Sequence, residues 1–261
     1  WSTGKSEKCI LCYPRLESGQ PTVCSETCVG RIRYLGVMLY DADRIPEAAS
    51  VAAEQDLYDA QLGLFLDPND PDVVAAARAD GVPEDWIEGA RNSPIWKMAM
   101  EWKIAFPLHP EFRTLPMVWY VPPLSPIQHA AEAGQIAAQD DMPDVRSLRI
   151  PLRYLANMLT AGDEAPVAQA LERMLAMRAY MRSKTVDGVI NLGIAQRVGM
   201  TPLEIDEMYH LLAIANYEDR FVIPTTHREV VEDAYDLRGG CGFTDGNACS
   251  SGNTGPLFGA K

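Results

Sequence analysis

Four of the six cysteines lie within 20 residues near the N-terminus, and no other feature constrains the fold as strongly. Their pattern is Cys9-x2-Cys12-x11-Cys24-x3-Cys28. The residues between the first and third cysteines show little helical periodicity, and proline and glycine residues impose turns on them. We therefore expect this segment to be held together by its cysteines and not by an apolar core.

Two kinds of metal site are compatible with this pattern. Soft metals prefer thiolate ligands, so the cluster indicates a metal or iron-sulfur site in a reducing compartment. A structural zinc ion would take all four thiolates as a closed tetrahedron, usually from two Cys-x2-Cys pairs, which Cys24-x3-Cys28 fits poorly. In two-cluster ferredoxin folds the fourth cysteine of a run, after an x3 spacing, binds a second cluster. Spacing alone does not decide between zinc, iron-sulfur and plain buried thiols.

Composition and charge limit the function classes. The formal net charge of -13 argues against a nucleic-acid partner, because a polyanion needs clustered Lys and Arg. No stretch reaches the roughly 18 to 20 consecutive apolar residues that a membrane-spanning helix requires. The chain begins with Trp1 and has no initiator Met or signal-peptide core, so we expect it to start inside a longer protein.

The chain divides into three unequal parts. Residues 1–36 hold the cysteine cluster and more basic than acidic side chains, whereas the acidity lies downstream. Residues 37–238 are expected to be mainly helical. Residues 239–261 form a Gly-rich stretch, which we expect to be irregular and to need a partner surface for order.

Capping residues mark several helix ends. Asp70 followed by Pro71 predicts a helix start, Gly81 predicts its end, and Pro83 opens another helix. Thr201 to Glu204 read as a capping box before an apolar face that comprises Met208, Leu211, Leu212 and Ala215.

A long helix and one strand complete the expected elements. The helix covers residues 166–183, with one face made of Val167, Leu171, Met174, Leu175, Arg178 and Met181. We interpret its methionines as core filler. Residues 112–121 favour an extended strand, which the prolines at 122 and 123 end.

The residues around the cysteines decide what the spacing leaves open. Residues 8–15 (KCILCYPR) and 19–36 (GQPTVCSETCVGRIRYLG) closely resemble the last cysteine motif of the beta subunits of respiratory nitrate reductases. The similarity continues in residues 67–71, 98–103, 113–126 and 214–221, and it covers essentially the whole chain.

The resemblance implies an α+β fold: a partial ferredoxin-like iron-sulfur segment (1–36), a mainly α-helical subunit-interface domain (37–238) and the irregular tail (239–261). Cys9, Cys12 and Cys24 would bind one 4Fe-4S cluster, and Cys28 would give one ligand to a second. The family's other cysteine motifs lie N-terminal to Trp1, and its 3Fe-4S cluster is expected only there. We therefore expect this chain alone to complete no cluster and to be inactive.

The resemblance also implies partners. Family members relay electrons from a haem b membrane gamma subunit to a molybdenum-containing catalytic alpha subunit in anaerobic nitrate respiration, on the cytoplasmic face of the membrane. Two alternatives stay open. The first is the beta subunit of a nitrite oxidoreductase or a related molybdenum dehydrogenase. The second is a non-redox helical interaction module with a structural zinc bound by the same four cysteines.

The remaining signals are weak. Ile10, Leu11 and Val23 are expected to keep water from the clusters, while nearby basic residues offset cluster charge or form an ordinary subunit-facing surface. Cys241 and Cys249 are interpreted as non-ligand thiols. The four histidines show no metal-binding grouping, and no pair of carboxylates identifies an acid-base dyad. We expect no catalytic residue, with nitrate chemistry in another subunit.

Overall fold

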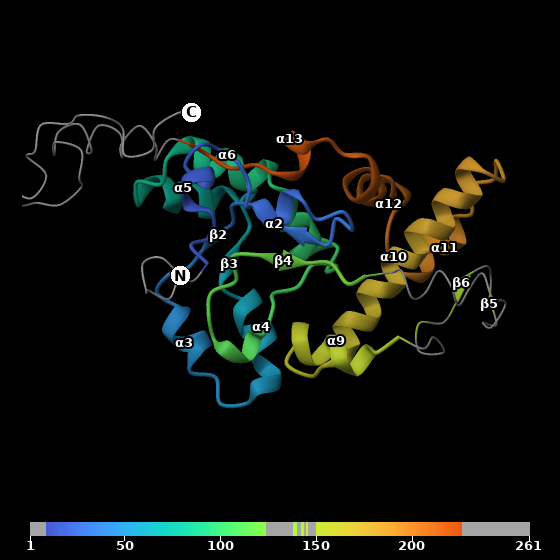
Figure 1. The fold of residues 1–261 in the computed structure, drawn as a ribbon, viewed down its shortest axis with the longest axis horizontal. Helices are drawn as coiled ribbons and strands as arrows, with labels where there is room; N and C mark the ends of the chain where they lie inside the picture. Colours follow the sequence, from blue (N-terminus) through green and yellow to red (C-terminus); the bar gives the residue numbers. More distant parts are fainter. Residues whose placement is uncertain (1–8, 124–137, 140–141, 144, 146–149, 226–261) are drawn as a thin grey trace, which may run out of the picture.

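The computed structural model describes residues 9–123, 138–139, 142–143, 145 and 150–225, and these residues are mainly helical (Figure 1). The tail from residue 239 and Cys241 and Cys249 lie outside them. The elements in chain order are α1 (Tyr13–Leu16), α2 (Val23–Glu26), β1 (Arg33–Tyr34), β2 (Leu39–Tyr40), α3 (Ile45–Ala49), η1 (Glu54–Asp56), α4 (Leu57–Leu62), β3 (Phe65–Leu66), α5 (Pro71–Ala79), α6 (Glu84–Asn92), α7 (Pro94–Trp96), η2 (Lys97–Glu101), η3 (Pro110–Phe112), β4 (Trp119–Tyr120), β5 (Ala138–Gln139), β6 (Met142–Pro143), α9 (Leu152–Leu159), α10 (Glu164–Thr185), α11 (Leu192–Arg197), α12 (Pro202–Tyr209), η5 (His210–Ile214) and α13 (Tyr217–Arg220).

The helix boundaries predicted from capping residues are confirmed. The Asp70 carboxylate accepts a hydrogen bond from the Asp72 N–H at 2.9 Å and caps α5. Gly81 then takes the left-handed conformation (φ +82°) just after that helix, where a side chain would be strained. Pro83 is the N-cap of α6.

The capping box at α12 is also present. The Thr201 hydroxyl accepts from the Glu204 N–H at 3.2 Å, and the Glu204 carboxylate accepts from the Thr201 N–H at 2.7 Å. Beyond it, Met208, Leu211 and Ala215 are buried as predicted. The helix continues into a π-helical turn, η5, before it ends at Ala215.

The strands form three antiparallel pairs, which are β1 with β4, β2 with β3, and β5 with β6. In the first pair Arg33 lies opposite Tyr120 and Tyr34 lies opposite Trp119. Backbone hydrogen bonds of 2.8 and 2.9 Å also join Tyr120 to Phe106. The cysteine segment is thereby tied to residues about 85 positions further along the chain.

The strand predicted for residues 112–121 was wrong in its extent, because only Trp119 and Tyr120 pair. Arg113 adopts the left-handed conformation (φ 58°), which interrupts an extended chain. Its guanidinium donates to the carbonyls of Ala49 (2.8 Å) and Val51 (2.6 Å). Tertiary hydrogen bonds therefore override the local strand preference of this segment.

The hydrophobic core joins the β1–β4 pair to the C-terminal helices. Figure 1 shows α10 as the longest helix at one end of the molecule, and α9, α11 and α12 pack against it. Four of its predicted apolar residues are buried, namely Val167, Leu171, Met174 and Leu175, and Met181 is half-buried against the same core. Arg178 has the helical spacing of this face, but its side chain is exposed.

Within the described residues no helix is long and apolar enough to cross a membrane.

A pair of substitutions on α10 tests the core assignment. Leu171→Ala removes a fully buried side chain and should lower the free energy of unfolding by about 2–5 kcal/mol through lost burial and a cavity. Arg178→Ala, two turns further along the same helix at an exposed position, should change it by no more than about 0.5 kcal/mol. Urea denaturation followed by circular dichroism measures both, and equal losses would contradict the assignment.

Candidate functional site

The first two cysteines lie on a tightly turned backbone. Leu11 and Cys12 both adopt the left-handed conformation, with φ of 56° and 51°. Such a conformation costs a non-glycine residue of order 1–3 kcal/mol, and it occurs mostly at functional sites. The turn directs the Leu11 N–H to the Cys9 sulfur at 3.3 Å. This turn therefore provides a backbone hydrogen bond to the Cys9 sulfur.

Arg15 joins the parts of the segment that carry the first and the second cysteine pair. Its guanidinium forms an ion pair with the Glu26 carboxylate and donates from Nε to the Pro21 carbonyl at 2.9 Å. Tyr217 of α13 lies near this pair. Its pKa is raised by partial burial and by the Glu26 carboxylate, with Arg15 lowering it. The charge of Arg15 is thus largely balanced within the chain.

The third cysteine, Cys24, lies in α2 next to two buried hydroxyl side chains. Thr22 and Ser25 are buried, and their hydroxyl oxygens are 2.8 Å apart in a hydrogen bond. The Cys24 thiol donates to the Thr22 hydroxyl at 3.5 Å. This pair of hydroxyls fixes the turn on which Cys24 is presented.

Aromatic residues of the β1–β4 pair lie close to the third and fourth cysteines. Burial raises the pKa of Tyr120, Arg33 lowers it, and negative charge at Cys24 and Cys28 raises it further. The Arg33 guanidinium is 5.4 Å from the centre of the Tyr120 ring. The α2 helix packs against β1, so the core pairing also sets the position of Cys24.

The expected water shield is not provided by the described residues alone. Ile10 is 68% exposed and Val23 is 46% exposed. Cys9 and Cys24 are exposed, whereas Cys12 and Cys28 are half-buried. Leu11 lines an apolar groove of about 420 Å³ together with Leu16, Phe65 and other core-edge residues. The cysteines thus lie at an apolar surface.

Zinc and a 4Fe-4S cluster require different spacings of the ligand sulfurs. Sulfur atoms about 2.3 Å from one zinc ion would lie roughly 3.8 Å from one another. In the part of the chain that the structure describes, no three His, Cys, Asp or Glu side chains converge as ligands of one ion. A 4Fe-4S cluster instead takes each thiolate at a separate iron, so its ligand sulfurs lie further apart. The four thiols are donors that suit either metal.

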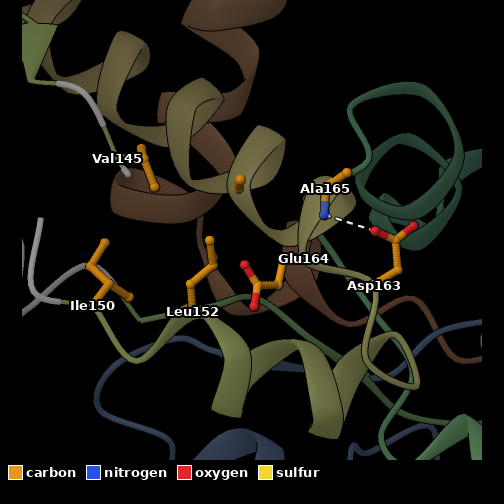
Figure 2. A pocket seen from close by; sticks show the side chains of 7 residues that line it. Val145, Ile150, Leu152, Asp163, Glu164 and Ala165 are labelled. Carbon is orange, nitrogen blue, oxygen red and sulfur yellow. Dashed lines mark hydrogen bonds between the residues drawn. The ribbon is translucent and has the colours of Figure 1, made fainter. Parts of the chain in front are cut away.

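A cavity elsewhere in the molecule carries no catalytic arrangement. Its volume is about 530 Å³, and it lies between α9 and the start of α10 (Figure 2). The Asp163 carboxylate caps α10 by accepting from the Ala165 N–H at 2.9 Å. Glu164 stands among apolar side chains such as Ile150 and Leu152. Among the described residues that line this cavity, no acid and base are paired.

Two sequence models match the chain. Residues 1–38 match the 4Fe-4S dicluster domain, and residues 124–202 match the family described as respiratory nitrate reductase beta C-terminal. The cofactors expected from the cysteine motif are therefore confirmed as the 4Fe-4S type. At the coarser level this also agrees with an iron-sulfur segment followed by a helical region.

Curated relatives extend the similarity over most of the chain. The respiratory nitrate reductase 1 beta chain of Escherichia coli is 63% identical over 97% of this chain and 50% of its own length. The respiratory nitrate reductase beta chain of a Bradyrhizobium species is 48% identical over 87% of this chain and 68% of its own length. The dimethylsulfide dehydrogenase subunit beta of Rhodovulum sulfidophilum is 31% identical over 69% of this chain and 36% of its own length. This chain spans about half the length of the Escherichia coli relative.

The hydroxyl pair beneath Cys24 gives a testable prediction. Thr22→Val should lower the free energy of unfolding by about 1–3 kcal/mol, because it leaves the buried Ser25 hydroxyl without its partner. The double variant Thr22→Val/Ser25→Ala removes both polar groups and should lose less than the sum of the two single variants. Thr27→Val, at an exposed hydroxyl of the same segment, is the matched control and should change little. Strict additivity in urea denaturation would contradict the coupling.

Proposed function

Because the chain belongs to the family of respiratory nitrate reductase beta chains, we propose that it is the part of an electron-transfer subunit that supplies ligands to two 4Fe-4S clusters. Cys9, Cys12 and Cys24 bind one cluster, and Cys28 supplies one ligand to the second. The observation that carries this proposal is the turned Cys9–Cys12 backbone with its N–H directed at sulfur, within a segment that matches a dicluster domain.

The chain's own residues hold and tune the sulfur ligands. When bound, a 4Fe-4S cluster accepts and releases one electron at a time. The Leu11 N–H donates to the Cys9 sulfur, which lowers the charge on that ligand and raises the reduction potential. Once Cys24 is a thiolate, the Thr22 hydroxyl can rotate and donate to its sulfur. The Arg15–Glu26 ion pair keeps the two halves of the segment in register.

The proposed partners are a molybdenum-containing catalytic alpha subunit and a haem b membrane gamma subunit. The subunit would lie on the cytoplasmic face of the membrane, held there by these partners. The exposed apolar side chains support such contacts: they include Ile10 and Val29 beside the cysteines and a group after α10 that comprises Val186, Val189, Ile190 and Leu192. Apolar groups that gather on a surface commonly mark protein contacts.

Nitrate is the proposed substrate of the assembled complex. The identity to the Escherichia coli nitrate reductase chain is about twice that to the dimethylsulfide dehydrogenase chain, and it extends over a larger share of this sequence. This difference favours nitrate reduction over a related dehydrogenase. The chain itself is proposed to contain no catalytic residue.

Single substitutions of the cysteines test the ligand assignment. In the complete subunit, assembled with its partners, Cys9→Ala and Cys28→Ala should disturb two different paramagnetic signals, because the two thiolates belong to different clusters. Electron paramagnetic resonance of the reduced variants measures this. Cys241→Ala and Cys249→Ala are the controls and should disturb neither signal. Loss of one and the same signal from both Cys9→Ala and Cys28→Ala, in a complex that still co-purifies, would refute the assignment.

A further inference from the structure

Residues 214–221 resemble the family in sequence, and the structure places them against the cysteine segment. Arg31, three residues after Cys28, donates from Nη1 to the Ala215 carbonyl at 3.3 Å. Figure 1 shows α13 next to the part of the chain that carries α2. The two segments are 184 residues apart in sequence at this contact, so the fold brings them together.

Arg220 is the last residue of α13, and its burial is unusual for a charged group. Only 8% of its surface is exposed, and within the described residues its Nε and Nη2 atoms have no hydrogen-bond acceptor. The nearest carboxylate in sequence, that of Asp219, accepts instead from the Asn216 N–H at 3.1 Å. Buried N–H groups of a charged side chain that lack an acceptor are costly to stability.

The guanidinium of Arg220 lies over two aromatic rings. Its central carbon is 5.6 Å from the centre of the Tyr34 ring and 4.9 Å from that of Phe221. Tyr34 is fully buried in β1. Its pKa is raised by burial and lowered by Arg220 and Arg31, while negative charge at Cys28 raises it. The Tyr34 ring thus contacts Arg220 and belongs to β1, the strand against which the cysteine-bearing helix α2 packs.

We propose that Arg220 influences electron transfer through its charge. Its buried positive charge raises the reduction potential of the cluster that Cys28 ligates. This inference rests on the proposed function. Reduction adds a negative charge to the cluster, and a nearby fixed positive charge stabilises that reduced form. Burial strengthens the interaction, because water does not screen a charge inside the protein as it does at the surface. Arg220 would act through space and would not ligate iron.

Arg220→Met tests this directly. Methionine keeps an apolar stem between Tyr34 and Phe221 and removes unpaired N–H groups, so the variant should still fold. In the complete subunit assembled with its partners, potentiometric titration followed by electron paramagnetic resonance gives each cluster's midpoint. At a fixed potential, the ratio of reduced to oxidised Cys28-ligated cluster should fall about tenfold, which is a shift of about 59 mV to more negative values for one electron. The cluster bound by Cys9 should shift less.

Two further variants complete the test. Arg220→Lys keeps the charge, so the midpoint potential of the Cys28-ligated cluster should stay close to the wild-type value. Arg173→Met is the matched control. Arg173 lies in α10 and is also partly buried with an unpaired Nε, but its Nη1 donates to the Trp102 carbonyl. Its loss should leave both midpoints unchanged.

Each outcome is decisive. Unchanged midpoints in Arg220→Met, with both clusters present, would overturn the inference while leaving the proposed function intact. Failure of both Arg220 variants to assemble would overturn it too, because Arg220 would then be needed for folding. If Cys28→Ala, introduced alone into the complete subunit, alters no cluster signal, the proposed function is refuted instead.

Discussion

The pairing of β1 with β4 joins the cysteine segment to the hydrophobic core, and the arrangement of the site depends on it. Tyr34 lies opposite Trp119, and both side chains are buried. The segment before Tyr34 has few buried apolar residues of its own, so this pairing and the Arg15–Glu26 ion pair hold its turns. Two short strands thereby position Cys24 and Cys28 relative to the rest of the protein.

The same pairing explains why a C-terminal segment reaches the site. Tyr34 presents its ring to Arg220, and Arg31 binds the Ala215 carbonyl. The surface around Cys9 and Cys24 is left exposed and apolar. A thiolate segment that is tied to the core on one side and open on the other suits an electron-transfer protein, which must hold its cofactor rigidly yet close to a partner.

Local chemistry made part of the fold predictable from sequence. Asp70 and Thr201 cap helices through contacts within a few residues, and the structure confirms both. Arg178 is exposed although it shares the apolar face, because helical spacing identifies a face without showing how far neighbouring helices cover it. The strand at residues 112–121 was overestimated because Arg113 is bound by carbonyls more than 60 residues away. Contacts of that kind leave no local pattern in a sequence.

The site was predictable in its identity but not in its surroundings. Cysteine spacing left zinc and iron-sulfur open, and the neighbouring residues identified the family, which the relatives confirm. Arg220 and Tyr34 were missed as neighbours of the site, because their only signal was membership of family-like stretches. The most direct measurement is the iron, acid-labile sulfide and zinc content of the complete subunit and of its Cys24→Ala variant, both purified without oxygen. We predict that the variant loses iron and sulfide together, about four of each. Loss of one zinc ion with unchanged iron would contradict the account.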